Sequence, residues 1–455
     1  MVRQRPRWRT PPCWVGCRCA GGGGTSPGRR IPSGPELAKH FGALCRWSSG
    51  GLARRPGRSH HPFLENGCPT LACTYAALGP QARPSGSLHH ARRLALFGSC
   101  SAEILERVSV LVTARIPGVR RILIVLLGAI GDVTRALPLL PRLKALYPQA
   151  RIAWAVEPPS FTLVEKHPWI DEVLLFDRAR GLRGFAAFLR RVREFHADLC
   201  LDLQRHAKSG VVSLASGAPV RLGFHRRNSR EGNWLALTHT IEPQPHLSSK
   251  LQQFQYFADW LGAPSLPVSF GIAPEKHEEE RVEHLLRTVP RPFVAAFLGS
   301  SCPSRLWFPA RTAAVIDALC SAGIATVLVG GKGEQEFARE VSQAARAPTW
   351  DFTAQTNLRE LYALFRRSAA AFGPDSGPMH LAAAAGIPVV SLWGATSPAR
   401  SAPWNNEHLV IQGDAPCSPC YRKTCPIGRL CMQSISVEAV LETVLRCLPK
   451  ALEEH

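Results

Sequence analysis

Short apolar runs alternate with amphipathic stretches along the chain from residue 120 onward. The first run predicts a buried strand over 122–127, then a glycine-containing turn over 128–131 and a helix with one apolar face made of Ala136, Leu140, Leu143 and Leu146. Further strands are predicted over 151–156, 172–176, 199–203, 293–298, 325–330, 369–372, 389–393 and 409–412, and helices over 185–195 and around 207–215. This alternation is typical of a parallel α/β sheet with helices on both faces.

The same pattern divides the chain into domains. Residues 243–291 are Pro-rich and charged, which favours a linker between two Rossmann-like halves. We therefore expect an N-terminal Rossmann-like domain over 116–270 and a C-terminal one over 291–455. Arginines at 115, 120 and 121 interrupt the most apolar region, so that no run of eighteen apolar residues exists and a membrane-spanning helix is not expected.

Residues 1–115 differ in composition from the rest. They hold a GGGG run, seven of the fifteen cysteines, no Asp and no sustained apolar period, which predicts a disordered extension. The opening lacks the apolar core of a signal peptide, although an Arg-rich, acid-poor start is compatible with an organelle transit peptide. We expect either an unstructured extension or an upstream translation that the mature protein lacks. The alternative is a disulfide or metal framework, but the cysteine spacing matches no known pattern.

The stretch 372–394, FGPDSGPMHLAAAAGIPVVSLWG, carries the clearest candidate chemistry. An apolar strand ends at Gly373, Asp375 or Ser376 is placed to cap a helix, and a second buried strand follows. The N-H groups and positive dipole end of such a helix form a site for an anion, with His380 one turn in. The alternative is an ordinary capped helix with a surface histidine.

The charge balance places most of the basicity in the first part of the chain. Residues 1–120 hold 18 Lys or Arg and 4 Asp or Glu, which is +14 of the net charge of +21. The mild excess in the remainder fits an anionic substrate or a membrane surface better than duplex nucleic acid.

Five segments in this order resemble the ADP-heptose:lipopolysaccharide heptosyltransferase family of GT-B glycosyltransferases: GAIGDVTRALPLLPRLKALYP, DLCLDLQRHAKSG, GSSCPSRLWFP, LVGGKGEQEFA and FGPDSGPMHLAAAAGIPVVSLWGATSP. The resemblance covers about residues 120–448. The Arg230–Gly232 triplet, REG, which follows a strand with the sequence RLGF (221–224), is similar to the type I enzymes, which add the first heptose to Kdo. The fold implied is two Rossmann-like domains that face each other across a cleft.

The resemblance implies roles for residues on the donor side. Asp132 matches the proposed general base of an inverting displacement, whereas a helix cap is its ordinary alternative. Arg305 stands where the family usually carries Lys and would neutralise the leaving diphosphate, although Leu306 and Phe308 replace a basic residue and a proline. The expected nucleotide-sugar site comprises Ser300, Ser301, Glu334, Asp375, Ser376, Gly377 and His380. Glu336 is an alternative to Glu334 as a ribose acceptor, and either acid would ordinarily begin a solvated helix.

Cations on the acceptor side suit a carboxylated sugar such as Kdo. Arg205, His206, Lys208 and Arg230 are these candidates, although a charged helix face usually meets only solvent. Separately, the cysteines of CSPCYRKTCPIGRLC (Cys417, Cys420, Cys425 and Cys431) are read as reduced thiols, a structural metal site or disulfides. Catalysis requires no metal or other cofactor on this interpretation, because no Asp-x-Asp pair lies on a loop to hold Mg²⁺.

The expected function is inverting transfer of heptose from ADP-heptose to Kdo-lipid A or another inner-core acceptor of lipopolysaccharide. The implied location is the cytoplasm of a Gram-negative bacterium, in peripheral contact with the inner face of the inner membrane and without a nucleic-acid partner. Two alternatives remain open. One is a related GT-B transferase or sugar-nucleotide epimerase that uses another nucleotide sugar; the other is a non-enzymatic basic interaction protein.

Overall fold

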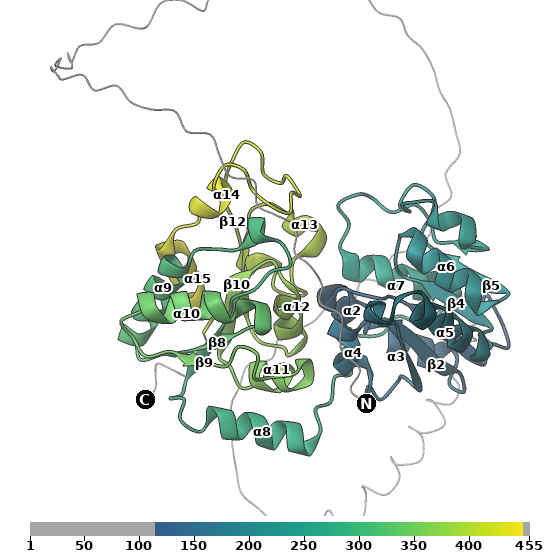
Figure 1. The fold of residues 1–455 in the computed structure, drawn as a ribbon, viewed down its shortest axis with the longest axis horizontal. Coiled ribbons are helices and arrows are strands. Elements are labelled where there is room, and N and C mark those ends of the chain that lie inside the picture. Colours follow the sequence, from purple (N-terminus) through teal and green to yellow (C-terminus); the bar gives the residue numbers. More distant parts are fainter. Residues whose placement is uncertain (1–113, 449–455) are drawn as a thin grey trace, which may run out of the picture. The chain divides into compact units, whose positions relative to one another are not determined.

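The structure is a computed structural model that describes residues 114–448 (Figure 1). It contains two six-stranded parallel sheets, one in each half of the described chain. The extension predicted over 1–115 lies almost wholly outside the described residues.

The first sheet has the strand order β3-β2-β1-β4-β5-β6. Its strands are β1 (Arg121–Val125), β2 (Arg151–Val156), β3 (Glu172–Leu175), β4 (Leu199–Asp202), β5 (Val220–Gly223) and β6 (His239–Thr240). The helices of this half are α2 (Ile130–Ala136), α3 (Leu139–Leu146), α4 (Pro158–Val164), η1 (Arg178–Arg180), α5 (Gly181–Glu194), α6 (Ala207–Ser216), η2 (Asn233–Ala236) and α7 (Lys250–Leu261).

The second sheet has the order β12-β11-β10-β7-β8-β9. Its strands are β7 (Phe293–Phe297), β8 (Ala325–Val329), β9 (Trp350–Asp351), β10 (Ala370–Pro374), β11 (Val389–Trp393) and β12 (Val410–Gln412). The helices are α8 (Lys276–Leu286), which precedes the sheet, η3 (Pro303–Arg305), α9 (Pro309–Ser321), η4 (Lys332–Glu334), α10 (Gln335–Ala344), α11 (Leu358–Phe365), α12 (Gly377–Ala384), α13 (Pro398–Ser401), η5 (Glu407–Leu409), α14 (Leu430–Gln433) and α15 (Val437–Cys447).

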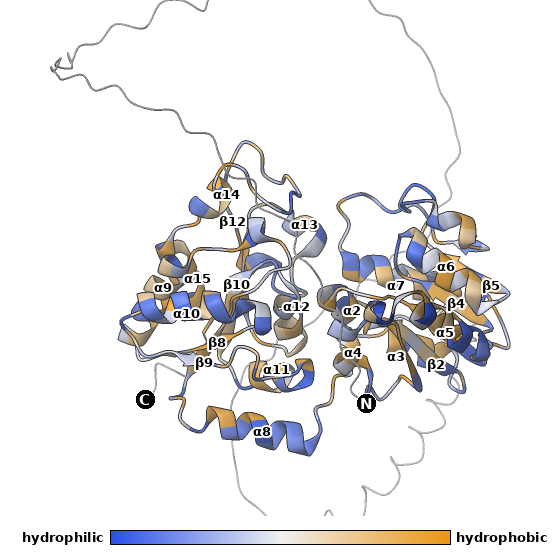
Figure 2. Ribbon diagram, in the orientation of Figure 1, coloured by the Kyte–Doolittle hydropathy of each residue, from blue (hydrophilic) through white to orange (hydrophobic). Residues whose placement is uncertain are grey.

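Both sheets follow the same doubly wound order, so the prediction of two Rossmann-like halves is confirmed. The central strands are apolar along their whole length because helices cover both faces; all five residues of β7, β8 and β11 are buried. In Figure 2 strand β8 is largely orange, whereas the outer helix α8 carries many blue, hydrophilic residues. Strands β6 and β9 were not predicted, since two residues at a sheet edge leave no apolar period.

Two local predictions differ from the structure. The single helix expected after β1 is divided into α2 and α3, because Pro138 has no N-H to donate and its ring clashes with the preceding turn. The stretch expected as a linker contains α7 and α8. Helix α7 contacts α2 and α3 through a face that includes buried Phe254 and Phe257, and this apolar face is interrupted by enough polar residues to obscure the pattern.

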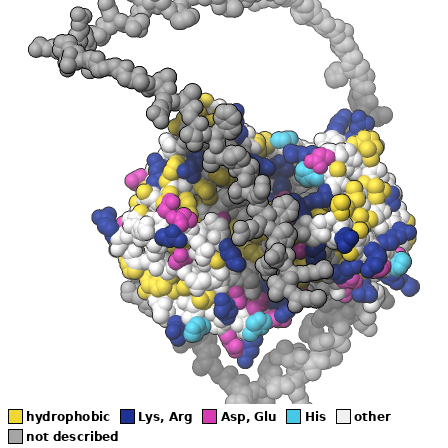
Figure 3. Space-filling model, viewed as in Figure 1, with side chains coloured by type: hydrophobic (Ala, Val, Ile, Leu, Met, Phe, Trp, Pro, Cys, Tyr) yellow, Lys and Arg dark blue, Asp and Glu magenta, His cyan; other side chains and the backbone are white. Residues whose placement is uncertain are grey.

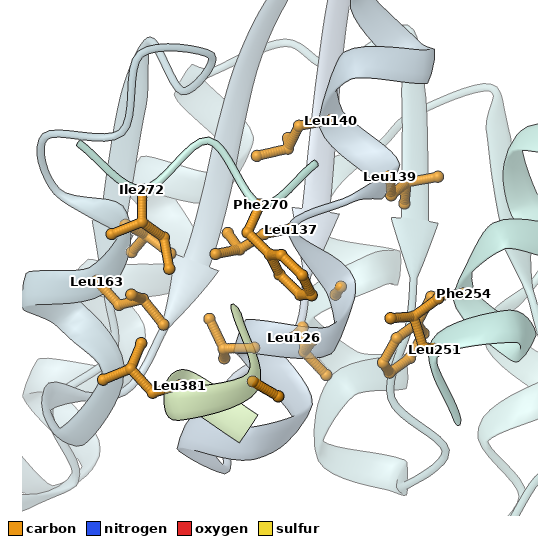
Figure 4. Packing of buried hydrophobic residues seen from close by; sticks show 14 of the residues in the cluster. Leu126, Leu137, Leu139, Leu140, Leu163, Leu251, Phe254, Phe270, Ile272 and Leu381 are labelled. Atoms are coloured by element: carbon orange, nitrogen blue, oxygen red, sulfur yellow. The ribbon is translucent and has the colours of Figure 1, made fainter. Parts of the chain in front are cut away.

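The two halves share a packed interface in which α2 contacts α12. Leu381 of α12 belongs to the same apolar cluster as Leu126, Leu163 and Phe270, as Figure 4 shows from close by. The helices approach closely because Gly131 has no side chain: a Cβ there would lie 2.5 Å from Cδ2 of His380. This contact fixes the loop after β1 beside the helix that follows β10.

Among residues 114–448, no helix is both long enough and apolar enough to cross a membrane.

Replacement of Gly131 by Ala should separate α2 from α12, because the new methyl group overlaps the buried His380 ring. Overpacking of this kind lowers the free energy of unfolding by about 1–3 kcal/mol. Urea denaturation followed by circular dichroism measures the change. Gly333→Ala is the matched control, since a Cβ at Gly333 meets no atom within 4 Å. Equal stability of the two variants would contradict the close approach.

Candidate functional site

Four loops meet where the strand order of each sheet reverses. In the first sheet these loops follow β1 and β4, and in the second they follow β7 and β10. Ligands of open α/β sheets bind at such points, outside the carboxyl ends of the strands. Three neighbouring cavities lie there: a central one of about 250 Å³, one of about 280 Å³ and one of about 180 Å³.

Asp132 lies between the central cavity and the cavity of about 180 Å³. It is the third residue of α2, and its Oδ1 accepts from Nη2 of Arg135 at 2.5 Å and from Nζ of Lys250 at 2.6 Å. Nζ of Lys250 also lies 2.9 Å from Oδ2. Asp132 therefore does not act as the cap of α2, whose N-cap position is Ala129.

The pKa values at this cluster are strongly perturbed. Burial alone would raise the pKa of Asp132, but the charges of Lys250 and Arg135 outweigh burial and hold the pKa well below its usual range. Burial also lowers the pKa of Lys250 to about 8, although Asp132 opposes the shift. Asp132 is thus ionised at neutral pH and is held in place by two cations.

Arg305 enters the central cavity from η3 and is positioned by an acid. Its Nη1 lies 3.1 Å from Oδ2 of Asp375, which also accepts a 2.6 Å bond from Oγ1 of Thr396. The Asp375 carboxylate is therefore engaged in holding Arg305 and Thr396. Ser300 donates to the carbonyl oxygen of Asp375 at 2.9 Å, and Ser301 lies on the cavity wall.

Helix α12 begins at the central cavity with Ser376 at its N-cap position and Gly377 as its first residue. The sequence predicts that Asp375 or Ser376 caps this helix. Neither side chain makes a capping hydrogen bond. His380 is buried rather than on the surface. Burial, then the charge of Arg135, holds the pKa of His380 well below its usual value, so the ring is neutral.

Unpartnered polar atoms gather on this cavity. In the described part of the chain, nine buried side-chain nitrogen or oxygen atoms have no hydrogen-bond partner. Five of them belong to residues that line the central cavity: Nε of Arg135, Arg305 and Arg400, Oγ of Ser376 and Nδ1 of His380. Buried polar atoms are almost always satisfied, so these five atoms would bind water or a polar ligand in the cavity.

The charges that line the central cavity favour a dianion. Four cations (Arg135, Lys250, Arg305 and Arg400) face two carboxylates, those of Asp132 and Asp375. The remaining excess of two positive charges, together with the N-terminus of α12, matches a diphosphate.

The cavity of about 280 Å³ is mostly apolar and adjoins the central one through Ala129, Ser301, Ser376 and Gly377. Glu334 is its acidic residue, and its Oε2 accepts a 2.7 Å bond from the N-H of Gly331. Glu336 instead pairs with Arg339 on the exposed face of α10. Of the two acids that the sequence left open, Glu334 lines this cavity and Glu336 does not.

The cavity of about 180 Å³ holds three of the four cations expected on the acceptor side, namely Arg205, His206 and Arg230. Arg205 lies over the Phe224 ring at 4.1 Å and donates to Oε1 of Gln253, and burial lowers its pKa to about 10. Lys208 does not line this cavity. It pairs with Glu157 at 2.5 Å, so its assignment to the acceptor site is not supported by its position.

Sequence reasoning missed several residues of the site: Lys250, Arg135, Arg400, Thr396 and Tyr421. Arg135 lies within the first motif, one helical turn after Asp132, and Thr396 and Arg400 lie at or just after the end of the last one. These three positions were available from motif position. Lys250 was not, because it begins α7 within the stretch that the sequence predicts as a linker.

The cysteine block follows β12. In the described structure Cys417, Cys420, Cys425 and Cys431 are free thiols, with Cys417 exposed and Cys431 buried. Burial, and then the neighbouring three thiols, raises the pKa of Cys431. Across residues 114–448, no group of three or more His, Cys, Asp or Glu residues is arranged to hold a metal ion.

One family model and several known proteins are similar to this chain. The family model described as glycosyltransferase family 9 (heptosyltransferase) matches residues 185–430, which is more than half of the chain. The lipopolysaccharide core heptosyltransferase OpsX of Haemophilus influenzae is 26% identical over 292 residues, covering 63% of this chain and 82% of that protein. Lipopolysaccharide heptosyltransferase 1 of Pseudomonas aeruginosa is 25% identical over 319 residues, covering 67% and 87%.

A solved structure shares the fold. The ADP-heptose lipopolysaccharide heptosyltransferase II of E. coli has a TM-score of 0.60 and 22% sequence identity, and the match covers 74% of this chain and all of that one (100%).

The cation excess predicts that the central cavity binds inorganic pyrophosphate. Arg305→Met should weaken this binding about tenfold or more, because a charge-assisted hydrogen bond to a buried anion is lost. Stabilisation of the full chain against heat by increasing pyrophosphate measures the affinity. Arg339→Met, on the exposed face of α10, is the matched control and should bind as the wild type does. Equal affinity of both variants would place the anion elsewhere.

Proposed function

The chain belongs to glycosyltransferase family 9 and is a glycosyltransferase, and we propose that it moves heptose from ADP-heptose to the Kdo or inner-core region of lipopolysaccharide. The names of two relatives include lipopolysaccharide heptosyltransferase activity, and that of the E. coli structure includes ADP-heptose. These names support the proposal for this chain without fixing its acceptor.

The observation that carries the proposal is the order of the three cavities. The apolar cavity with Glu334 suits a nucleoside, whose ribose hydroxyls would donate to the carboxylate. The central cavity suits the diphosphate, and the third cavity suits an anionic sugar acceptor. Asp132 lies on the walls of the second and third cavities, where donor and acceptor would meet.

The proposed reaction is a single inverting displacement. The acceptor hydroxyl oxygen forms a bond to the anomeric carbon of heptose while the bond from that carbon to the ADP oxygen breaks, and the hydroxyl proton passes to Asp132. A carboxylate with so low a pKa is a weak base, so it accepts the proton late, when bond formation has made the hydroxyl acidic. Arg305, Arg400 and the N-terminus of α12 stabilise the charge that develops on ADP.

On the acceptor side, Arg205, His206 and Arg230 would bind the carboxylate of a Kdo-like sugar. Arg230 belongs to the REG triplet that is similar to the type I enzymes, so we propose transfer of the first heptose to Kdo. Such an acceptor is anchored in a membrane, which gives the enzyme a place of action at the cytoplasmic face of the inner membrane.

Asp132→Asn should lower acceptor-dependent ADP release about 10²-fold or more, since the amide cannot accept the proton but keeps the shape of the side chain. The assay uses the full chain with ADP-heptose, with and without Kdo-lipid A. Asp414→Asn, which changes an exposed acid after β12, is the matched control and should retain activity.

Three outcomes of this assay would contradict parts of the proposal. Turnover that needs no acceptor would indicate an epimerase. Turnover of another nucleotide sugar in place of ADP-heptose would overturn the donor. Binding of no nucleotide sugar would favour an interaction protein without enzymatic activity.

The kcat/KM of the wild type should fall as the pH rises above about 8, because Lys250 then loses its proton and the cavity loses a positive charge. Burial lowers the pKa of Arg400, another cation of this cavity, but a guanidinium keeps its proton in proteins. In Lys250→Arg the alkaline decline should move to higher pH, because guanidinium keeps its proton. An unchanged alkaline limb in that variant would exclude Lys250 as its origin.

A further inference from the structure

The excess of basic over acidic residues in the described chain lies almost wholly in its N-terminal half. Residues 114–270 contain 21 Lys or Arg and 12 Asp or Glu, whereas residues 271–448 contain 17 and 16. Within the first half the excess is concentrated over 178–235, with 12 basic and 4 acidic residues. The central cavity does not explain this excess of basic residues, because the stretch 178–235 contributes no residue to that cavity.

The same stretch exposes an apolar surface, which we call the α6–η2 patch. It consists of Val211 and Leu214 on α6 and Trp234 and Leu235 on η2, with exposed fractions of 43%, 53%, 42% and 71%. Helix α6 packs directly against η2, so the two elements that carry these four exposed side chains are neighbours in the fold. Figure 3 shows apolar side chains gathered beside Lys and Arg on the molecule's surface.

The patch is held in a fixed position by a buried network. Nδ2 of Asn233 donates to Oδ2 of Asp202 at the end of β4 at 2.8 Å, and the same nitrogen lies 3.1 Å from Oγ of Ser209. Ser213 of α6 donates to the same Asp202 oxygen at 3.0 Å. Asn233 immediately precedes Trp234 and Leu235, so the network presents these two side chains outward from an ordered turn.

Arginines lie beside the patch and in the cavity of about 180 Å³, which we call the acceptor cavity. The guanidinium of Arg226 lies 5.9 Å from the centre of the Trp234 ring. Arg230 lines the acceptor cavity, and its backbone N-H donates to the carbonyl oxygen of Arg205 at 2.7 Å. Since η2 begins three residues after Arg230, the patch and the cavity lie on adjoining parts of one surface.

We propose that the α6–η2 patch docks on an anionic lipid bilayer, with Trp234 and Leu235 inserted at the interface and Arg226 and Arg227 near the lipid phosphates. Trp and Leu bordered by Arg fit the boundary between headgroups and acyl chains, where apolar burial and charge attraction add. Nucleic acid would satisfy the arginines but offers no apolar phase for Leu235. This inference rests on the proposed function in one respect: a lipid-anchored acceptor would lie in the same bilayer, beside the acceptor cavity.

Vesicle co-sedimentation of the full chain tests the surface without donor or acceptor. The vesicles contain phosphatidylglycerol and phosphatidylethanolamine, or phosphatidylcholine alone. Residues 1–113 are also basic, so wild-type binding by itself does not locate the surface, and variants are compared within the full chain. The double variant Trp234→Ser/Leu235→Ser should lower the partition coefficient on anionic vesicles about tenfold or more.

A second variant separates charge from apolar burial. Arg226→Gln/Arg227→Gln should lower partitioning about fivefold per arginine at low salt, and its effect should fade as salt rises. The matched control is Ile427→Ser, which removes an exposed apolar side chain (51%) from the C-terminal half and should partition as the wild type does. Circular dichroism melting confirms that each variant is folded.

The outcomes distinguish this surface from the enzymatic proposal. Equal partitioning of the wild type and the Trp234/Leu235 double variant overturns the patch, as does an equal loss in Ile427→Ser. RNA binding is measured on the same variants. If the double variant loses RNA binding but binds vesicles as the wild type does, the patch binds nucleic acid and the membrane proposal is overturned. Patch-dependent vesicle binding by a chain that releases no ADP from ADP-heptose would uphold the surface while rejecting the transferase function.

Discussion

The close packing of α2 against α12 is the constraint on which the rest of the site depends. Each helix follows a strand at the point where its own sheet reverses order, so each carries the loop that a Rossmann-like half uses for its ligand. The contact leaves no room for a side chain at Gly131, and it places His380 against the backbone of the opposite half. Without this contact, Asp132 and Arg305 would belong to two separate surfaces.

The charged groups at this junction stabilise one another. A buried carboxylate is costly by itself, and the pairing of Asp132 with Lys250 and Arg135 offsets that cost. Asp375 forms an ion pair with Arg305 on the other side of the cavity. The two acids use part of the positive charge and leave an excess of two, which suits a diphosphate. A ligand that brings its own negative charge is therefore the partner that this cavity stabilises.

Sequence patterns predicted the parts of this structure that are locally encoded. Apolar runs such as 389–393 specify buried parallel strands, and the motif around Asp375 and His380 places a helix N-terminus beyond the second sheet. Neither periodicity nor motif spacing could show that the Asp375 carboxylate pairs with Arg305 and accepts a hydrogen bond from Thr396. Those contacts depend on loops that the tertiary fold brings together. For the same reason, Lys208 matched a pattern of cations yet pairs with Glu157 and does not line the cavity that holds the other three.

Lys250 shows most clearly why part of the candidate site could not be predicted from the sequence. It is the first residue of α7, and the polar residues between the buried positions of that helix hide its apolar face from a periodicity search. The helix nevertheless returns across α2 and α3, because Phe254, Phe257 and Leu261 complete the apolar core of the first half. Core packing thus positions a cation 118 residues away in sequence against Asp132. The proposed base and the residue that sets its charge are joined by the tertiary fold alone, so a change in the core beneath α7 would alter the electrostatics of the site without touching any residue that lines it.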